Sequence, residues 1–142
     1  MDQADIFGPL LALMLLTLLV WIYMYVRRIG FIRRERIDAR RLELPGELAR
    51  LSPATVSNPS DNLKNLFELP VLFYALALLL YVTNRVDETY VVVAWVFVVF
   101  RFAHSFVHCT FNRVMVRFYC YLAAALALWI MLLRAGYDYL VA

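Results

Sequence analysis

The chain has 142 residues, of which 64% are hydrophobic, 15% aromatic and only 18% charged, and its mean hydropathy is +0.70. This composition excludes an ordinary water-soluble globule, and it excludes a disordered chain, which has few aromatic residues and many charges. The length leaves no room for a second large domain, so we expect one compact membrane domain over residues 1–142. The net charge is +3. Because the basic residues cluster next to apolar segments, this charge indicates membrane topology and not a nucleic-acid partner.

Four apolar segments are long enough to cross a bilayer. Residues 6–26 contain no charged side chain, and at about 1.5 Å per residue they span roughly 31 Å, close to the thickness of the hydrocarbon core. Asp2 and Asp5 precede them without any Lys or Arg, so we expect this segment to be retained and not cleaved as a signal peptide. The predicted spans cover residues 6–28, 62–83, 89–109 and 116–134. An Asn58-Pro59 pair predicts the start of the helix that contains the second span.

The predicted loop over residues 29–61 and its flanks concentrate positive charge. They hold nine of the 14 Lys and Arg residues: Arg27, Arg28, Arg33, Arg34, Arg36, Arg40, Arg41, Arg50 and Lys64. By the positive-inside rule this loop is cytoplasmic, and alternation then places both termini outside the cytoplasm. Short turns between the last three spans make them antiparallel neighbours, so we predict an all-α, up-and-down four-helix membrane bundle.

Polar side chains recur within the spans at helical spacing. They are Asn65 and Glu68 on the second span, Arg101, His104 and His108 on the third, and Arg117 and Tyr121 on the fourth, with Arg113 just before them. Inserting an ionisable side chain into the bilayer costs about 2.5 to 3.5 kcal/mol, so we expect each of these groups to have a polar partner or to face a water-filled cavity. The direction of each span places all of these groups in its cytoplasmic half. We therefore expect one polar layer at a single depth.

This layer has an excess of positive charge. Its cations are Arg27, Arg28, Lys64, Arg101, Arg113 and Arg117, against Glu68 alone. Arg suits forked contacts with carboxylates, and the single Glu can take an ammonium group, so a small zwitterion with more than one carboxylate fits. If the reactive atom of this ligand is a thiol, a nearby Arg in a site of low dielectric favours the nucleophilic thiolate.

The residues that carry these groups resemble a known family. The stretch Asn65-Leu-Phe-Glu68-Leu-Pro70, then Ala94-Trp95, Arg101-Phe-Ala-His104, Arg117 and Tyr121 is similar to the membrane-associated proteins in eicosanoid and glutathione metabolism (MAPEG), and most to small bacterial members. The resemblance covers residues 58–135 and the charged end of the first span. It implies a homotrimer in a bacterial inner membrane, with glutathione as co-substrate bound between subunits at the cytoplasmic side. It also implies transfer of the thiolate to a hydrophobic electrophile, or reduction of a lipid hydroperoxide.

The resemblance also implies roles for individual residues. Arg117 would stabilise the thiolate and Tyr121 would donate a hydrogen bond, so these two are the predicted catalytic residues. The predicted glutathione-binding residues are Arg34, Asn65, Glu68, Arg101, His104, His108 and Arg113. His108 departs from the family, which commonly has Tyr there, and Phe118 stands where some members carry Ser.

Structural interpretations stay open beside these roles. Glu68 and Arg101 could form a buried ion pair that only fixes helix register, and Arg113 and Arg117 could be topology charges at the lipid headgroups. We predict no metal site, because His104 and His108 have no second pair of ligands elsewhere in the chain. The alternative to a transferase or peroxidase is a non-catalytic scaffold or lipid-binding protein, whose basic loop contacts membrane lipids.

Overall fold

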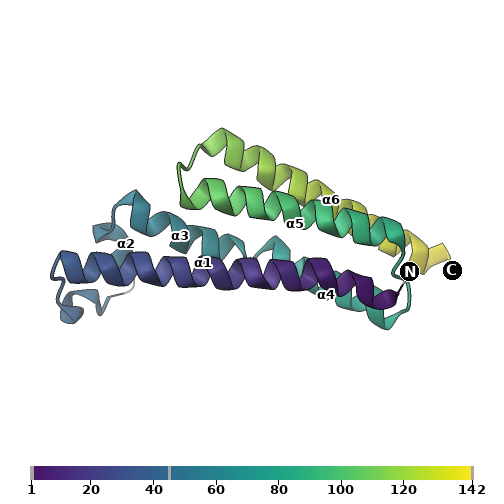
Figure 1. Cartoon of the computed structure of the whole chain (residues 1–142), viewed down its shortest axis with the longest axis horizontal. Coiled ribbons are helices and arrows are strands. Elements are labelled where there is room, and N and C mark those ends of the chain that lie inside the picture. The colour runs from purple at the N-terminus through teal and green to yellow at the C-terminus, as the bar shows by residue number, and fades with distance from the viewer. Residues whose placement is uncertain (1, 45, 142) are drawn as a thin grey trace.

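The computed structural model describes residues 2–44 and 46–141, and the backbone alone for Ala39. Its long helices run along one common direction, and the first and last described residues lie at the same end of the bundle (Figure 1). The chain passes along the bundle four times, through α1 (Phe7–Arg34), α3 (Ala54–Asn65) with α4 (Leu69–Val82), α5 (Glu88–Cys109) and α6 (Val114–Val141). The predicted up-and-down four-helix bundle is confirmed.

Three short helices complete the described part of the chain. The 3-10 helix η1 (Gln3–Ile6) precedes α1, while η2 (Ala39–Leu42) and α2 (Glu47–Leu51) lie in the connection from α1 to α3. We call the end of the bundle with this connection the loop end, and the opposite end the termini end. The first helix runs past the expected span of residues 6–28 to Arg34, so its last turns carry the basic residues of the loop end.

All four passes are long and apolar enough to span a bilayer. In their interior, Leu13, Phe97 and Leu128 are fully buried, and Phe97 stacks on Phe73 with 4.8 Å between ring centroids. The buried face of α6 carries small side chains, including Ala124 and Ala127, which let two membrane helices approach closely. Many large apolar side chains point outward instead, among them Leu11, Leu15, Leu18, Leu78, Val99, Leu126 and Leu133. These side chains suit contact with lipid.

The second pass begins earlier than the sequence predicts. The expectation that Asn58 and Pro59 open its helix is wrong, because α3 begins at Ala54 and Pro59 lies inside it. A proline inside a helix cannot donate to the carbonyl four residues before it, which here belongs to Thr55. Arg27 Nε of α1 donates to that carbonyl at 3.3 Å. The neighbouring helix therefore satisfies the acceptor that Pro59 leaves free.

The second pass is also interrupted, between Asn65 and Leu69. Pro70 lies in the first turn of α4; in a continuous helix it could not donate to the Leu66 carbonyl, and its ring would clash with that carbonyl. The break separates Leu69 from the Asn65 carbonyl, to which its N–H would donate in an unbroken helix. Only a long contact of 3.4 Å from the Glu68 N–H remains within the pass. The Asn65 carbonyl thus lacks its usual helical donor and can accept a hydrogen bond from another helix.

Candidate functional site

A layer of polar side chains lies in the half of the bundle nearer the loop end. We call it the polar layer: Asn65 of α3, Arg101, His104 and His108 of α5, and Arg117 and Tyr121 of α6. The three α5 residues occupy one face of that helix and are almost fully buried, with exposures of 0%, 3% and 4%. Asn65, Arg117 and Tyr121 are half-buried and form the accessible edge.

Arg101 is a fully buried cation. Its Nη2 donates at 2.8 Å to the Asn65 carbonyl, the acceptor that the break before Pro70 sets free. Its Cζ lies 5.7 Å from the Tyr121 ring centroid, in a cation–π contact. No ion pair to Arg101 occurs within residues 2–44 and 46–141, and its Nε and Nη1 find no hydrogen-bond partner there. A buried, unpaired charge is unfavourable, so this side chain is suited to an anion.

His104 contacts the backbone of the neighbouring helix. Its Nδ1 lies 3.0 Å from the Arg117 carbonyl oxygen. A carbonyl oxygen can only accept, so we assign the proton of a neutral His104 to Nδ1, which leaves a lone pair on Nε2. The His108 ring lies edge-on to His104, with 5.6 Å between centroids. Among the described atoms, His104 Nε2 and His108 Nδ1 are buried and have no hydrogen-bond partner.

Arg117 and Tyr121 are one turn apart at the start of α6. The Tyr121 ring centroid lies 5.8 Å from that of His104, so its phenol borders the histidine pair. Arg117 Nη1 donates to Asn112 Oδ1 at 2.7 Å. These two predicted catalytic side chains therefore lie at the edge of the same layer as Arg101 and His104.

Two of the predicted residues lie outside the polar layer in a single protomer. Glu68, at the N-cap of α4, and Arg113, just before α6, are both exposed. The structural ion pair considered between Glu68 and Arg101 does not form in the described part of the chain. Glu68 lies within the break between α3 and α4, so helical geometry does not hold its side chain on the same face as Asn65.

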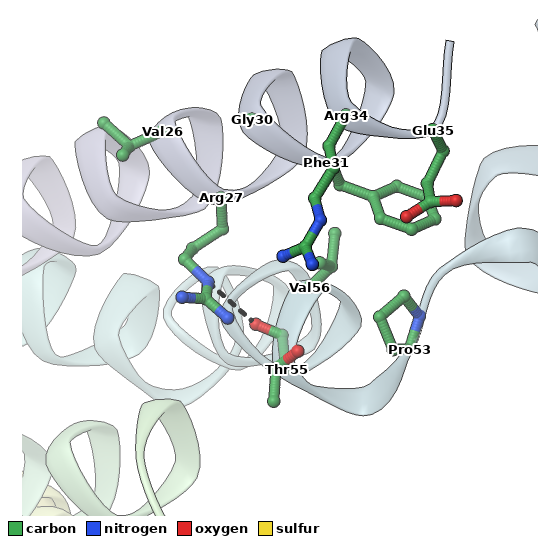
Figure 2. A pocket seen from close by; sticks show the side chains of 9 residues that line it. All are labelled: Val26, Arg27, Gly30, Phe31, Arg34, Glu35, Pro53, Thr55 and Val56. Carbon is green, nitrogen blue, oxygen red and sulfur yellow. Dashed lines mark hydrogen bonds between the residues drawn. The ribbon is translucent and has the colours of Figure 1, made fainter. Parts of the chain in front are cut away.

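Arg34 lies in a separate cavity. Figure 2 shows Arg34 and Arg27 extending from α1 toward the start of α3, where Pro53 and Thr55 form the opposite wall. The cavity has a volume of about 360 Å³. Arg34 does not reach the polar layer of its own chain through any hydrogen bond or ion pair that the described residues make.

Several polar residues that support the layer were not predicted from the sequence. Asn112 holds Arg117, and its Nδ2 donates to Asn58 Oδ1 at 3.2 Å. Asn62 is fully buried; its Oδ1 accepts from Ser105 Oγ at 3.3 Å, and its Nδ2 contacts Cys109 Sγ at 3.5 Å. Asn62 could have been noticed as an amide within a span, whereas Asn112 lies in a turn where asparagine is common.

Within the residues that the structure describes, no group of three or more His, Cys, Asp or Glu side chains is placed to hold a metal ion. One nitrogen of His104 is already in contact with a carbonyl.

The fold and the layer define a class of protein: an integral membrane protein with four spans and a buried, cationic, imidazole-rich layer near one end of the bundle. Residues 6–137 match the model of the MAPEG family. The chain belongs to the MAPEG family, as the resemblance predicts. Comparisons with curated proteins and with solved structures found no match. Membership of this family implies, in general terms, a glutathione-related enzyme activity in a membrane.

Proposed function

We propose that this chain is a glutathione-dependent transferase or peroxidase that acts on hydrophobic electrophiles or lipid hydroperoxides. The observation that carries the proposal is a set of four buried polar atoms that have no partner among the described residues: Arg101 Nε and Nη1, His104 Nε2 and His108 Nδ1. Leaving such atoms unpaired costs about 1 to 3 kcal/mol each. A ligand rich in carboxylates and amides, such as glutathione, would satisfy them.

The binding roles follow from the chemistry of each side chain. Arg101 offers the N–H groups of Nε and Nη1 as separate, charge-assisted donors to carboxylate oxygens, and the histidine pair offers the lone pair of His104 Nε2 and the free nitrogen of His108, Nδ1. Glu68 would take the ammonium group and Asn65 would bind the peptide, while Arg113 at the exposed edge would draw a second carboxylate. Arg34 would join the site from a neighbouring subunit in a homotrimer.

The reaction needs a thiolate at the edge of the layer. Glutathione would lose its thiol proton to water, because the positive charge of Arg117 favours the ionised sulfur and Tyr121 would donate a hydrogen bond to it. In transfer, the sulfur attacks an electrophilic carbon, a C–S bond forms, and the leaving group departs with its electron pair. In peroxide reduction, the sulfur attacks the outer peroxide oxygen, an S–O bond forms as the O–O bond breaks, and the departing alkoxide takes a proton from water to leave as the alcohol. A second glutathione then converts the sulfenic acid to a disulfide and water.

The membrane orientation belongs to the same proposal. The loop end carries most of the Lys and Arg residues, so the positive-inside rule places it in the cytoplasm and both termini outside, in a bacterial inner membrane. The polar layer then faces the compartment that holds glutathione. Lipids and hydrophobic co-substrates would reach it from the bilayer.

Purified protein and one matched pair of variants test the function. Wild-type protein should show glutathione thiolate absorbance, conjugate chlorodinitrobenzene, and unfold at a higher temperature with millimolar glutathione. Arg117→Ala should lose at least about tenfold in conjugation rate, since a charge-assisted contact contributes about 1.5 to 3 kcal/mol. Arg41→Ala removes an exposed Arg of the loop end and should keep activity. If wild-type protein shows neither thermal stabilisation nor a thiolate, the non-catalytic scaffold or lipid-binding function is favoured instead.

A further inference from the structure

The turn between α5 and α6 contains a residue in an unusual backbone conformation. Asn112 has φ of 44°, in the left-handed region that asparagine, aspartate and glycine tolerate best. Its N–H donates to the Val107 carbonyl at 2.8 Å, which closes the end of α5. The backbone thus restricts this position to a few residue types, chiefly asparagine, aspartate and glycine. These differ in whether the side chain carries a hydrogen-bond acceptor and a charge.

The Asn112 side chain is oriented from two sides. Arg117 Nη1 donates to its Oδ1 at 2.7 Å, and its Nδ2 donates to Asn58 Oδ1 at 3.2 Å. A guanidinium can only donate, so Asn112 must present its oxygen to Arg117 and its amide nitrogen to Asn58. Asn58 on α3 therefore sets the orientation in which Asn112 receives Arg117.

Arg117 is held at two points but is not neutralised. Its guanidinium contacts Asn112, and its carbonyl contacts His104 Nδ1. In the described part of the chain no Asp or Glu pairs with Arg117. Arg134, on the same helix near the termini end, shows the contrasting arrangement, because Asp87 binds it through both carboxylate oxygens. The chain thus pairs one α6 arginine with a carboxylate and the other with a neutral amide.

From this contrast we infer that Asn112 is a positioning residue that holds the Arg117 guanidinium in place while leaving its charge available to an incoming thiolate. The inference rests on the proposed function. An aspartate would fit the same backbone and the same contact with Arg117, but its negative charge would cancel the field that favours the ionised sulfur. Asparagine combines the required backbone conformation, an oxygen acceptor and no charge.

The test compares two substitutions that the backbone tolerates. Asn112→Asp keeps the oxygen acceptor and adds a negative charge, whereas Asn112→Gly keeps the left-handed backbone and removes the acceptor. Asn84→Asp is the matched control, because Asn84 also has positive φ, 55°, in the turn between α4 and α5 at the termini end. The readouts are the pH titration of glutathione thiolate absorbance on the purified protein, and kcat and KM for chlorodinitrobenzene.

We expect Asn112→Asp to raise the apparent pKa of the bound glutathione thiol by at least about one pH unit, and Asn84→Asp to leave it at the wild-type value. Asn112→Gly should lower kcat several-fold with little change in the KM for glutathione, because Arg117 loses its fixed position but keeps its charge. An unchanged thiol pKa in Asn112→Asp would overturn the inference. If that variant does not fold, a wild-type kcat in Asn112→Gly overturns it as well. A wild-type protein without any thiolate would instead refute the proposed function.

Discussion

Asp87 and Arg134 face each other across the termini end of the bundle, where the carboxylate that caps α5 accepts hydrogen bonds from both Nη atoms of an α6 arginine. The same carboxylate accepts the Tyr90 N–H at 2.9 Å, as an N-cap residue does. One side chain therefore ends the turn from α4 and joins α5 to α6. Although burial raises the pKa of Asp87, the hydrogen bonds from Arg134 and from the backbone N–H groups of Tyr90 and Thr89 outweigh it and lower that pKa below its ordinary value.

The Asp87 ion pair should make stability depend on pH in the acid range. Its folded-state pKa is lowered, so its contribution is present above the unfolded pKa of about 3.9 and is lost as pH falls through the folded-state pKa. Asp87→Asn keeps a capping oxygen and removes the charge. We expect it to lower stability by about 0.5 kcal/mol at neutral pH, because both side chains are partly exposed and water screens the pair. Thermal unfolding in detergent should show this difference shrinking below about pH 4. A difference that is constant down to pH 3 would contradict the ion-pair explanation.

The buried hydroxyl of Tyr90 should contribute to stability independently of its ring. Tyr90 is 1% exposed, its hydroxyl donates to Asp138 Oδ2 at 2.8 Å, and Arg134 Cζ lies 4.3 Å from its ring centroid. Tyr90→Phe keeps the ring and the cation–π contact but leaves the carboxylate short of one donor. We expect a loss of about 1 kcal/mol in unfolding free energy, with wild-type conjugation activity because Tyr90 lies far from the loop end. An unfolding free energy of Tyr90→Phe equal to that of the wild type, with a loss confined to Tyr90→Leu, would assign the whole effect to the ring and contradict this prediction.

Removing Pro70 should weaken the polar layer from a distance. Pro70→Ala restores an N–H and removes the ring clash, so α3 and α4 can join into one helix. The Leu69 N–H would then compete with Arg101 for the Asn65 carbonyl. A hydrogen bond to a charged group contributes about 1.5 to 3 kcal/mol, so glutathione affinity should fall about tenfold or more. Isothermal titration measures the affinity, and amide hydrogen exchange at residues 66–69 reports whether the helix has closed. Closure without any loss of affinity would show that the Asn65 carbonyl does not position Arg101.

Arg101 should favour ligand binding at the expense of stability. It is fully buried and makes one hydrogen bond and one cation–π contact. Replacing a buried ion pair by apolar side chains of similar size is often neutral or stabilising by about 1 to 4 kcal/mol, and a buried charge without a counter-charge, such as Arg101, is unfavourable by itself. Arg101→Met should therefore unfold at an equal or higher temperature without glutathione, and glutathione should no longer raise that temperature. A clear drop in the unfolding temperature would identify Arg101 as a structural residue instead.

Much of this architecture is readable from the sequence, because it depends on neighbours along the chain. Apolar stretches of the right length predict four membrane passes, and spacings of three and four residues place Arg101, His104 and His108 on one helical face. The same local pattern predicts that Arg117 and Tyr121 lie one turn apart. Each of these features follows from helical geometry within a single element.

The contacts between elements follow from the tertiary structure alone. These contacts depend on the rotation and relative height of helices whose packing residues are far apart in sequence. That geometry decides whether Arg101 donates to the Asn65 carbonyl. It also decides whether Arg117 contacts Asn112 or a carboxylate. Pro70 was visible in the sequence, but its effect on the acceptor at Asn65 becomes apparent only when α5 lies beside the break. For the same reason Glu68, which is close to Asn65 in sequence, is exposed outside the polar layer.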